Sequence, residues 1–405
     1  MDTKILLQNL DALLITNPTN IRYLTGFGGA APEEREAYCL VTQDKLFLFT
    51  NALYREEVIQ LTRKPRGLKR LNLLASKGLT FIETSRENPF AKKLAEIMAG
   101  CNPAKCLGFE ENDLTVAEYQ KLKKELIGIT LVPTKGRIEE LRMIKRKDEI
   151  ANISAAAKLT DQCFDFILGK IKIGVTETDI AWEIESFIRK NGASLAFSPI
   201  VAFGKNSSQP HYLRSVFARG PLAKLQEDLL QTALRSSDII LLDFGAKING
   251  YCSDMTRVVF VGKPKDEWRQ AYNTVFDAQH AALEYLHLEG VKAHLPGDVR
   301  RSGADADHIA RRVIERAGYP TYPHSLGHGV GLAIHEIPRF IARKDRILPK
   351  PQPQKDAILL PGMVVTVEPG IYIEGQYGIR IEDLVLIRDN GIEILSVSSK
   401  KFTIL

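Results

Sequence analysis

Residues 238–262, DIILLDFGAKINGYCSDMTRVVFVG, contain two mostly apolar runs joined by Asn249-Gly250. Asn-Gly is a preferred dipeptide for the two-residue turn of a β-hairpin, because both turn positions require a positive φ. The segment therefore predicts an antiparallel hairpin in which Asp243 lies opposite Thr256. This hairpin places charged side chains in an otherwise apolar sheet.

Two aspartates are predicted to share one face of this hairpin. Asp254 lies two residues before Thr256, so the two-residue period of a strand puts it on the face of Asp243. Diagonal neighbours of this kind are about 7–8 Å apart at the backbone, which lets their side chains converge. Two carboxylates in apolar surroundings repel each other unless cations separate them, and a metal pair spaced about 3.5–4 Å would do so. A turn aspartate beside an unrelated edge-strand aspartate is the simpler interpretation, and it stays open at this point.

The C-terminal strands repeat this pattern of charge among apolar residues. Glu368 lies in VVTVEPG (364–370) and Glu382 lies in GIRIEDLVLI (378–387), where an unpaired charge would be costly. Arg380 shares a strand face with Glu382, so a structural salt bridge is the alternative for that glutamate. This alternative leaves Glu368 unexplained, and the four acidic residues together favour a metal site.

Histidines and glycines are concentrated in residues 324–336, HSLGHGVGLAIHE. Three glycines between residues 327 and 331 disfavour a helix and favour a loop that backbone and substrate can approach closely. A polar loop histidine is the simpler interpretation of any one of them, but three of the eight histidines lie in this segment. One imidazole with four carboxylates is an oxygen-dominated ligand set. It suits divalent manganese, cobalt, iron or zinc better than copper.

The remaining pattern predicts two parts of different organisation. Short apolar runs alternate with helical patterns at first, and Pro133, Lys135 and Gly136 then mark a boundary. Beyond it, helices and antiparallel strands are segregated, which defines the α+β class. Thr176 is expected to be the N-cap of a helix, with Asp179 at the capping-box position. The predicted strands are 11–16, 37–42, 45–50, 106–110, 128–134, 198–204, 363–373 and 378–388, and the predicted helices are 58–64, 88–100, 138–170, 176–190, 214–236, 266–287 and 305–317.

Composition argues against several classes of protein. A chain of 405 residues is long enough for two or three domains, and its net charge of +6 is mild. No apolar run approaches the roughly 18 residues of a membrane span, and the N-terminus lacks the features of a signal peptide. The five cysteines are scattered and form no CxxC pair, which favours reduced thiols in a cytoplasmic protein. The basic clusters 63–70 and 142–149 lack interleaved aromatic residues, so we interpret them as solvated faces and predict no nucleic-acid partner.

Taken together, these residues resemble the pita-bread metallopeptidases, and within them the proline peptidases, which are Xaa-Pro aminopeptidases and Xaa-Pro dipeptidases. Residues 324–336 match the proline-peptidase signature, and LLDFG, CSDMTR, GHGVG, VEPGIY and IRIED carry the ligand order Asp, Asp, His, Glu, Glu. The resemblance runs from about residue 138 to the end, and NPTNIRYLTGF (17–27) extends it loosely to the N-terminal part. It implies a pita-bread, creatinase/aminopeptidase-like catalytic domain over 137–405, preceded by a smaller α/β creatinase-type domain over 1–136.

The resemblance implies two divalent metal ions, with manganese as the first choice and cobalt, zinc and iron as alternatives. One ion would be held by Asp243, Asp254 and Glu382. The other would be held by Asp254, His328, Glu368 and Glu382, so that Asp254 and Glu382 bridge the pair.

The resemblance also implies roles for side chains around the metals. Glu368 would be the general base and proton shuttle. His211 would steady the oxyanion, and His335 would contact the substrate carbonyl. His324 would border the pocket for the proline ring, and Arg380 would orient a carboxylate that binds metal.

The implied activity is that of an Xaa-Pro aminopeptidase, which removes the first residue from a peptide with proline at the second position. A proline imide lacks an N–H, so an apolar pocket and a polarising metal pair can select it. An Xaa-Pro dipeptidase (prolidase) acting on dipeptides is the alternative. Methionine aminopeptidases lack the histidine signature and creatinases lack the metal ligands, so both are disfavoured. A non-enzymatic binding protein on this fold should have lost ligands, whereas all of them are present here.

Assembly and substrate length depend on parts of the chain that the resemblance covers less well. The resemblance implies a homodimer. Three segments depart from it: 215–236, 288–307 and 349–357. They are expected near loops that could rim the cleft, so they leave substrate length and partner contacts open without affecting the metal site.

Overall fold

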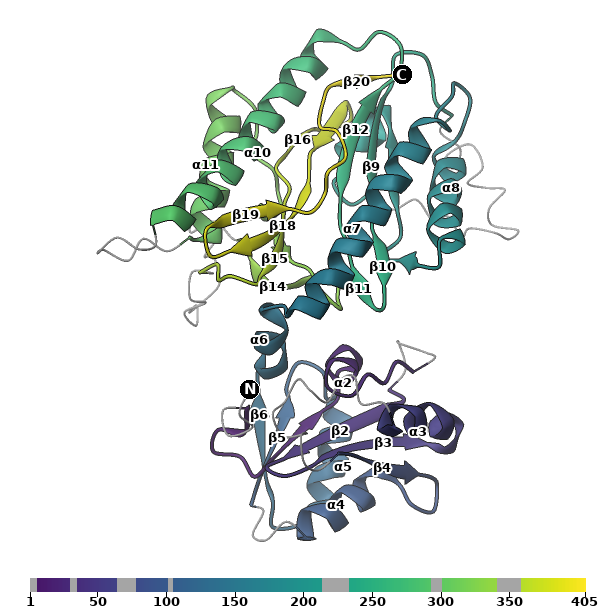
Figure 1. Ribbon diagram of the computed structural model, residues 1–405, viewed down its shortest axis with the longest axis vertical. Coiled ribbons are helices and arrows are strands. Elements are labelled where there is room, and N and C mark those ends of the chain that lie inside the picture. The colour runs from purple at the N-terminus through teal and green to yellow at the C-terminus, as the bar shows by residue number, and fades with distance from the viewer. Residues whose placement is uncertain are drawn as a thin grey trace. The chain divides into compact units, whose positions relative to one another are not determined.

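The computed structural model of the protein describes residues 6–29, 35–63, 78–100, 105–212, 233–292, 301–340 and 358–405. The chain divides into two compact units, Met1–Arg142 and Met143–Leu405. Each unit has its own sheets and its own hydrophobic core (Figure 1). The domain boundary after residue 136 stays a prediction.

The N-terminal unit is built on a six-stranded mixed sheet with the order β4-β3-β2-β1-β5-β6. Strands β1, β2 and β3 pair antiparallel, and the outer pairs β3–β4, β1–β5 and β5–β6 are parallel. Leu14 and Phe49 of the sheet pack with Leu94 of α4 and Leu122 of α5 in one buried cluster. The elements are β1 (Ala12–Ile15), α2 (Pro18–Thr25), β2 (Ala37–Thr42), β3 (Leu46–Asn51), η1 (Ala52–Tyr54), α3 (Arg55–Arg63), β4 (Leu79–Thr84), α4 (Phe90–Gly100), β5 (Cys106–Glu110), α5 (Val116–Glu125), β6 (Thr130–Thr134) and α6 (Arg137–Met143).

Four elements of this unit, α2, η1, β4 and α5, are absent from the sequence-based prediction. Helix α2 begins after Asn17, whose side chain accepts from two backbone N–H groups, and it ends at Gly26, where φ is 83°. Helix α5 begins at Thr115 with a capping box completed by Glu118. Both helices carry recognisable end signals, but they are only 8 and 10 residues long, so a search by periodicity over longer windows passes over them.

The C-terminal unit contains two larger sheets, ordered β20-β12-β9-β8 and β14-β13-β15-β18-β19, with helices on either side (Figure 1). Alternate residues of β9 face two different cores. Leu241 packs in the core that includes α10 and α11, and Leu242 packs in the core that includes α7 and α8. The elements are α7 (Lys147–Leu168), α8 (Glu177–Lys190), β7 (Ser194–Leu195), β8 (Ile200–Phe203), η4 (Gly204–Ser208), β9 (Ile239–Asp243), β10 (Ala246–Ile248), β11 (Tyr251–Cys252), β12 (Thr256–Phe260), α10 (Asp266–Lys292), α11 (Gly303–Arg316), β13 (His328–Gly329), β14 (Glu336–Arg339), β15 (Val364–Val367), β16 (Gly370–Ile373), β17 (Tyr377–Arg380), β18 (Asp383–Arg388), β19 (Gly391–Ile394) and β20 (Thr403–Ile404).

The predicted hairpin is confirmed, and so is its register. Asp243 pairs with Thr256, and the ladder continues to the turn through β10 and β11. Asn249 and Gly250 occupy the turn with φ of 50° and 88°, as a two-residue hairpin turn of this twist requires. The predicted capping box of Thr176 and Asp179 at the start of α8 is also present.

Two predicted continuous elements are interrupted in the structure. The helix expected over 138–170 is two helices, α6 and α7, because the Lys145 N–H donates to Gly362 O and Arg146 takes the extended conformation of an N-cap. The strands expected over 363–373 and 378–388 each divide in two, around Glu368 and Glu382. The helix expected over 214–236 and the additions at 215–236, 288–307 and 349–357 lie wholly or partly outside the described residues.

The basic cluster 142–149 is not a solvated face as a whole. Arg142 is 7% exposed and donates to Asn20 Oδ1, and Lys145 is 5% exposed and pairs with Glu336. The cluster 63–70 lies outside the described residues except for its first residue.

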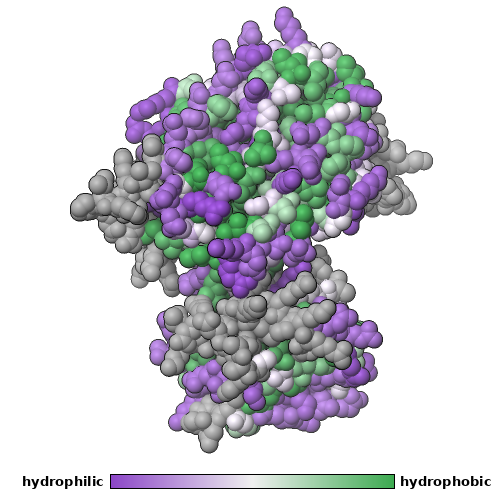
Figure 2. Space-filling view, in the orientation of Figure 1, coloured by the Kyte–Doolittle hydropathy of each residue, from purple (hydrophilic) through white to green (hydrophobic). Residues whose placement is uncertain are grey.

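The described helices are either too short or too polar to cross a lipid bilayer. Hydrophilic residues are spread over both units on the face shown in Figure 2, with smaller hydrophobic areas on the C-terminal unit. The described cysteines, Cys39, Cys106, Cys163 and Cys252, are free thiols.

Candidate metal centre

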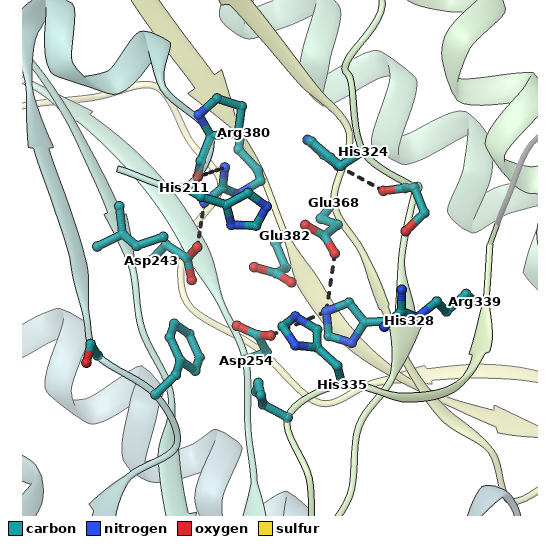
Figure 3. Close-up of a pocket in the computed structure, with 16 residues that line it drawn as sticks. His211, Asp243, Asp254, His324, His328, His335, Arg339, Glu368, Arg380 and Glu382 are labelled. Carbon is teal, nitrogen blue, oxygen red and sulfur yellow. Dashed lines mark hydrogen bonds and ion pairs between the residues drawn. The ribbon is translucent and has the colours of Figure 1, made fainter. Parts of the chain in front are cut away.

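The two aspartates reach the same cavity from the two sides of the hairpin. Asp243 is the last residue of β9, and Asp254 lies in the connection between β11 and β12. Because Asp243 is opposite Thr256, Asp254 lies diagonally across the hairpin from Asp243, as predicted. Both carboxylates are buried and line the cavity (Figure 3).

The two glutamates lie opposite one another in a second antiparallel ribbon. Val367 pairs with Asp383, and Gly370 pairs with Arg380, so the same register runs through the interruption and sets Glu368 against Glu382. Between these pairs both strands are interrupted, although the Ile381 N–H still donates to Pro369 O at 3.4 Å.

At this break the backbone of each glutamate bonds to a different segment of the site. The Glu368 N–H donates to Leu326 O at 2.8 Å, and the Glu382 N–H donates to Thr256 O at 3.2 Å. The interruption therefore lets Glu368 bond to the histidine-glycine segment and Glu382 bond to the hairpin.

The histidine-glycine segment forms a loop and the short strand β13, which confirms that it is not helical. A Cβ on Gly327 would lie 1.9 Å from Thr366 O, so only glycine allows this segment to lie so close to β15. His328 is the next residue in the chain. Its Nε2 lies 3.7 Å from Asp254 Oδ2 and 3.4 Å from Glu368 Oε1, and its Nδ1 lies 3.1 Å from Gly329 O.

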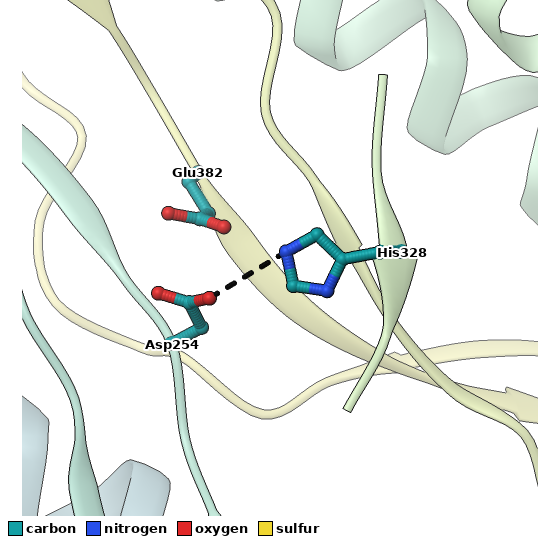
Figure 4. Close-up of side chains that lie close together, drawn as sticks. All are labelled: Asp254, His328 and Glu382. Atoms are coloured by element: carbon teal, nitrogen blue, oxygen red, sulfur yellow. Dashed lines mark ion pairs between the residues drawn. The ribbon is translucent and has the colours of Figure 1, made fainter. Parts of the chain in front are cut away.

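The side chains predicted for the site line a single cavity of about 590 Å³. Ligand atoms of Asp254, His328 and Glu382 all lie within 4.8 Å of one another (Figure 4). These three residues come from three separate segments, and each is buried. The predicted residues in the cavity lining are His211, Asp243, Asp254, His324, His328, His335, Glu368, Arg380 and Glu382.

Burial makes the charged state of the four carboxyl groups unfavourable. Burial raises the pKa of Glu368 to about 8, and burial also raises the pKa of Asp243. Burial, reinforced by neighbouring carboxylates, raises the pKa of Asp254 and of Glu382 well above the ordinary value. Four such groups in one cavity repel one another, and a bound cation would relieve this repulsion.

The donor set fits a divalent metal ion. Asp243 Oδ1 is buried and has no hydrogen-bond partner among the described residues, which is the state of an oxygen left available to a cation. Burial lowers the pKa of His328 to about 4, so the imidazole is neutral and its Nε2 can act as a ligand. Carboxylate oxygens with one imidazole suit manganese, cobalt, iron or zinc.

Arg380 connects the carboxylates rather than pairing with Glu382. Its Nη2 lies 2.5 Å from Asp243 Oδ2, and its Nε donates to Thr256 Oγ1 at 3.0 Å. The Thr256 hydroxyl in turn donates to Glu382 Oε2 at 2.7 Å. The alternative of a direct Arg380–Glu382 salt bridge is therefore wrong, because the guanidinium crosses to the hairpin instead of reaching along its own strand.

Tyr372 is a residue near the site that the sequence-based prediction missed. Its hydroxyl accepts from Arg380 Nη1 at 2.8 Å and lies 2.9 Å from His324 Nε2. His324 Nδ1 lies 2.9 Å from Ser325 O, so this nitrogen carries the proton and Nε2 accepts from the tyrosine. Burial lowers the pKa of His324 to about 3, which agrees with a neutral ring. The sequence offers no strong signal for Tyr372, since an aromatic residue on a strand is ordinary.

His335 and Arg339 lie on the rim of the cavity. The ring of His335 lies 4.5 Å from that of His328 in an edge-to-face arrangement. Burial and the nearby Arg339 lower the pKa of His335. Arg339 also lines the cavity, and the sequence-based prediction did not include it. An arginine after an Ile-Pro pair has no distinctive spacing in the sequence.

Comparisons with known proteins agree with this fold and site. The model of metallopeptidase family M24 matches residues 151–389, and the creatinase/prolidase N-terminal domain model matches residues 3–144. Fold and site define a pita-bread metallopeptidase of the proline peptidase group. The chain belongs to metallopeptidase family M24.

Among the relatives, the uncharacterized peptidase YqhT of Bacillus subtilis is 36% identical over 98% of this chain and 96% of its own length. An uncharacterized peptidase of Staphylococcus aureus is 33% identical over 96% of this chain and 95% of its own length. Among solved structures, an Xaa-Pro dipeptidase from Bacillus anthracis is 32% identical with a TM-score of 0.78, covering 99% of this chain and 98% of its own. An X-Pro aminopeptidase from Thermotoga maritima is 27% identical with a TM-score of 0.78, and both chains are covered fully, at 100%.

Proposed function

We propose that this chain is a two-metal exopeptidase that hydrolyses the Xaa-Pro bond at the N-terminus of peptides. The observation that carries the proposal is the convergence of Asp254, His328 and Glu382 within 4.8 Å in one buried cavity. Family membership supports it, as do the structural relatives, which include an Xaa-Pro dipeptidase and an X-Pro aminopeptidase.

The ligands divide into two overlapping sets. Asp243, Asp254 and Glu382 would hold one ion, and Asp254, His328, Glu368 and Glu382 would hold the other. When bound, such a pair polarises the carbonyl of the scissile bond and lowers the pKa of a water molecule. Manganese is our first choice, with cobalt, zinc and iron as alternatives, because the donor set is dominated by oxygen.

Glu368 is the side chain best suited to move the proton. Its carboxyl group lines the cavity, and its Oε1 lies 3.4 Å from Nε2 of the proposed ligand His328, within reach of a water molecule bound there. It accepts a hydrogen bond from the Thr366 hydroxyl at 3.1 Å, which restrains its orientation. We infer that Glu368 takes a proton from the attacking water and delivers it to the proline nitrogen as the bond breaks.

Three histidines would bind and stabilise the substrate. His211 and His335 line the same cavity and can donate to the oxygen that becomes negatively charged during attack. Both nitrogens of His324 are already engaged, by Ser325 O and by the hydroxyl of Tyr372. His324 would therefore offer the face of its ring to the proline, not a hydrogen bond.

Substrate length separates two candidate activities. The aminopeptidase favoured by the sequence would accept a peptide that continues beyond proline. A dipeptidase is the second candidate, and Arg339 favours it because a cation at the cavity can pair with the free carboxylate of a dipeptide. The solved relatives include a dipeptidase from Pyrococcus horikoshii, 30% identical with a TM-score of 0.78, over 100% of both chains.

Hydrolysis assays test the proposal and separate the candidates. The purified chain, supplied with Mn²⁺ or Co²⁺, is given Gly-Pro, Arg-Pro-Pro and the control peptide Arg-Ala-Ala. Release of arginine from Arg-Pro-Pro but not from Arg-Ala-Ala supports the aminopeptidase, and cleavage of Gly-Pro alone supports the dipeptidase. If neither proline peptide is cleaved by metal-loaded protein, the proposed function is wrong.

Assembly and location complete the proposal. We infer a homodimer from the family resemblance and a cytoplasmic location from the five scattered cysteines. Sedimentation equilibrium of the purified chain would test the first, and fractionation of the source cells would test the second.

A further inference from the structure

Gln279 is a buried polar side chain of α10 that the mechanism above does not use. It is 1% exposed. Its amide nitrogen Nε2 donates to Val367 O at 3.1 Å and to Ile381 O at 3.2 Å. These two carbonyls belong to the residues directly before Glu368 and Glu382, so one side chain joins the backbones of both glutamates.

The orientation of the Gln279 amide follows from the chemistry of its partners. Lys400 Nζ lies 3.0 Å from Oε1, and an ammonium group can only donate. The backbone carbonyls of Val367 and Ile381 can only accept, so Nε2 faces them. A reversed amide would set lone pairs against lone pairs and donors against donors.

A chain of ion pairs restrains this amide. Lys400 Nζ also lies 2.5 Å from Asp383 Oδ2, and Asp383 Oδ1 lies 2.7 Å from Arg257 Nη2. Arg257 Nη1 donates to the carbonyl oxygen of Glu382 at 2.5 Å. The network that begins at Gln279 therefore returns to the backbone of one of the two glutamates.

The interrupted ribbon explains why such a donor is needed. Glu368 and Glu382 direct their N–H groups away from each other, to Leu326 O and Thr256 O. Pro369 accepts from the Ile381 N–H but has no N–H of its own to return, so the Ile381 carbonyl needs another donor, because an unpaired buried carbonyl is destabilising. Gln279 supplies that donor and also bonds to Val367 O on the other side of the ribbon.

We propose that Gln279 is a positioning residue: through Val367 and Ile381 it sets the separation of the Glu368 and Glu382 carboxylates, and thereby the affinity for divalent metal. This inference rests on the proposed function, since it takes both glutamates as metal ligands. Groups behind metal ligands commonly change metal affinity by roughly 10- to 100-fold when they are removed.

The decisive variant is Gln279→Glu. Glutamate has the same shape and keeps an oxygen toward Lys400, but a carboxylate lacks the two N–H donors. The matched control is Gln270→Glu, the same change on the exposed face of the same helix. Mn²⁺ binding is measured by titration calorimetry, and the visible spectrum of the Co²⁺ form reports the ligand geometry.

The expected result is a Mn²⁺ affinity roughly 10- to 100-fold weaker in Gln279→Glu, with an altered Co²⁺ spectrum, while Gln270→Glu matches the wild type. Wild-type affinity and spectrum in a folded Gln279→Glu protein would overturn the inference. If that variant does not fold, Lys400→Met tests the inference instead. The Lys400 side chain is partly exposed, and its removal takes the hydrogen-bond donor away from Oε1 of Gln279. Mn²⁺ binding should again weaken, and unchanged binding would overturn the inference. If the wild type binds no Mn²⁺ at all, the proposed metal site fails as well, which distinguishes the two failures.

Discussion

The Nη2 atom of Arg380 lies 2.5 Å from Oδ2 of Asp243, and both side chains are buried. The same guanidinium reaches Glu382 through the hydroxyl of Thr256. One cation therefore orients two of the proposed ligands, while Asp243 Oδ1 keeps no hydrogen-bond partner among the described residues. The arrangement holds one oxygen of the aspartate and presents the other to a metal.

Replacing this arginine should weaken metal binding. Arg380→Lys keeps the positive charge, but a single ammonium cannot reproduce the fork that reaches Asp243, Thr256 and Tyr372 together. We expect Mn²⁺ affinity to fall roughly 10- to 100-fold, measured by titration calorimetry. Arg388→Lys is the control, because its pair with Glu393 is about half exposed, and it should bind Mn²⁺ like the wild type. Equal affinity in the two variants would contradict this role of Arg380.

Removing the proposed base should abolish turnover. Glu368→Ala deletes both a proposed ligand and the group that moves the proton, so we expect kcat for a proline peptide to fall by a factor on the order of 10³ or more. The measurement is steady-state hydrolysis at saturating Mn²⁺. Glu374→Ala, an exposed glutamate six residues along the chain, should keep full activity. Substantial activity in Glu368→Ala would refute the role of Glu368 as base.

Metal binding should depend on pH in a defined direction. Burial raises the pKa of Glu368 to about 8, above its value of roughly 4.3 in an unfolded chain. A raised pKa stabilises the metal-free fold at low pH, and this stabilisation is lost as pH rises toward about 8. Divalent cations must displace the same protons, so their affinity for the site increases as the pH rises toward about 8.

The rise in Tm on adding Mn²⁺ should therefore grow from about pH 5 to about pH 8. Differential scanning fluorimetry of metal-free and metal-loaded protein measures it. A rise in Tm that is constant across this range, or that shrinks with pH, would show that protons do not compete with metal at these carboxylates.

A buried ion pair next to the site should matter more for stability than an exposed one. Lys145 Nζ lies 3.2 Å from Glu336 Oε2, and the two side chains are 2% and 4% exposed. Glu336 also accepts from the Ala333 N–H at 3.0 Å, which shapes the loop that carries His335. Lys145→Met removes a buried cation from a buried carboxylate, at an expected cost of about 3–5 kcal/mol in the free energy of unfolding.

Urea unfolding of the metal-free protein measures this cost. The control is Lys170→Met, since the pair of Lys170 with Glu183 has side chains that are each 40% exposed, and its loss should cost about 0–1 kcal/mol. A cost for Lys145→Met no larger than that of the control would mean that Glu336 is held by other contacts.

Some features of the fold and of the candidate site were accessible from the sequence because they depend on near neighbours in the chain. The Asn249-Gly250 turn and the two-residue period of a strand were enough to place Asp243 opposite Thr256. The glycines around His328 disfavoured a helix, and Thr176 indicated the start of α8. Such signals act within a few residues, so they survive without knowledge of the rest of the molecule.

Other features arise only when distant segments pack together. Strand periodicity left open a pair between Arg380 and Glu382, but the ionic partner of Arg380 is Asp243, 137 residues away in the chain. The basic stretch around Lys145 had the composition of a surface, yet Lys145 is buried because Glu336, 191 residues away, neutralises it. Gln279 had no distinguishing pattern at all.

The sequence by itself therefore determined the types of the proposed ligands, their order and the register of the hairpin, because turn chemistry and strand periodicity are local. Only the tertiary structure decided where the strands are interrupted at Glu368 and Glu382, and which donors satisfy the backbone there. A buried charge or carbonyl must find a partner wherever packing brings one within about 3 Å, and that partner is set by the whole fold rather than by position in the chain.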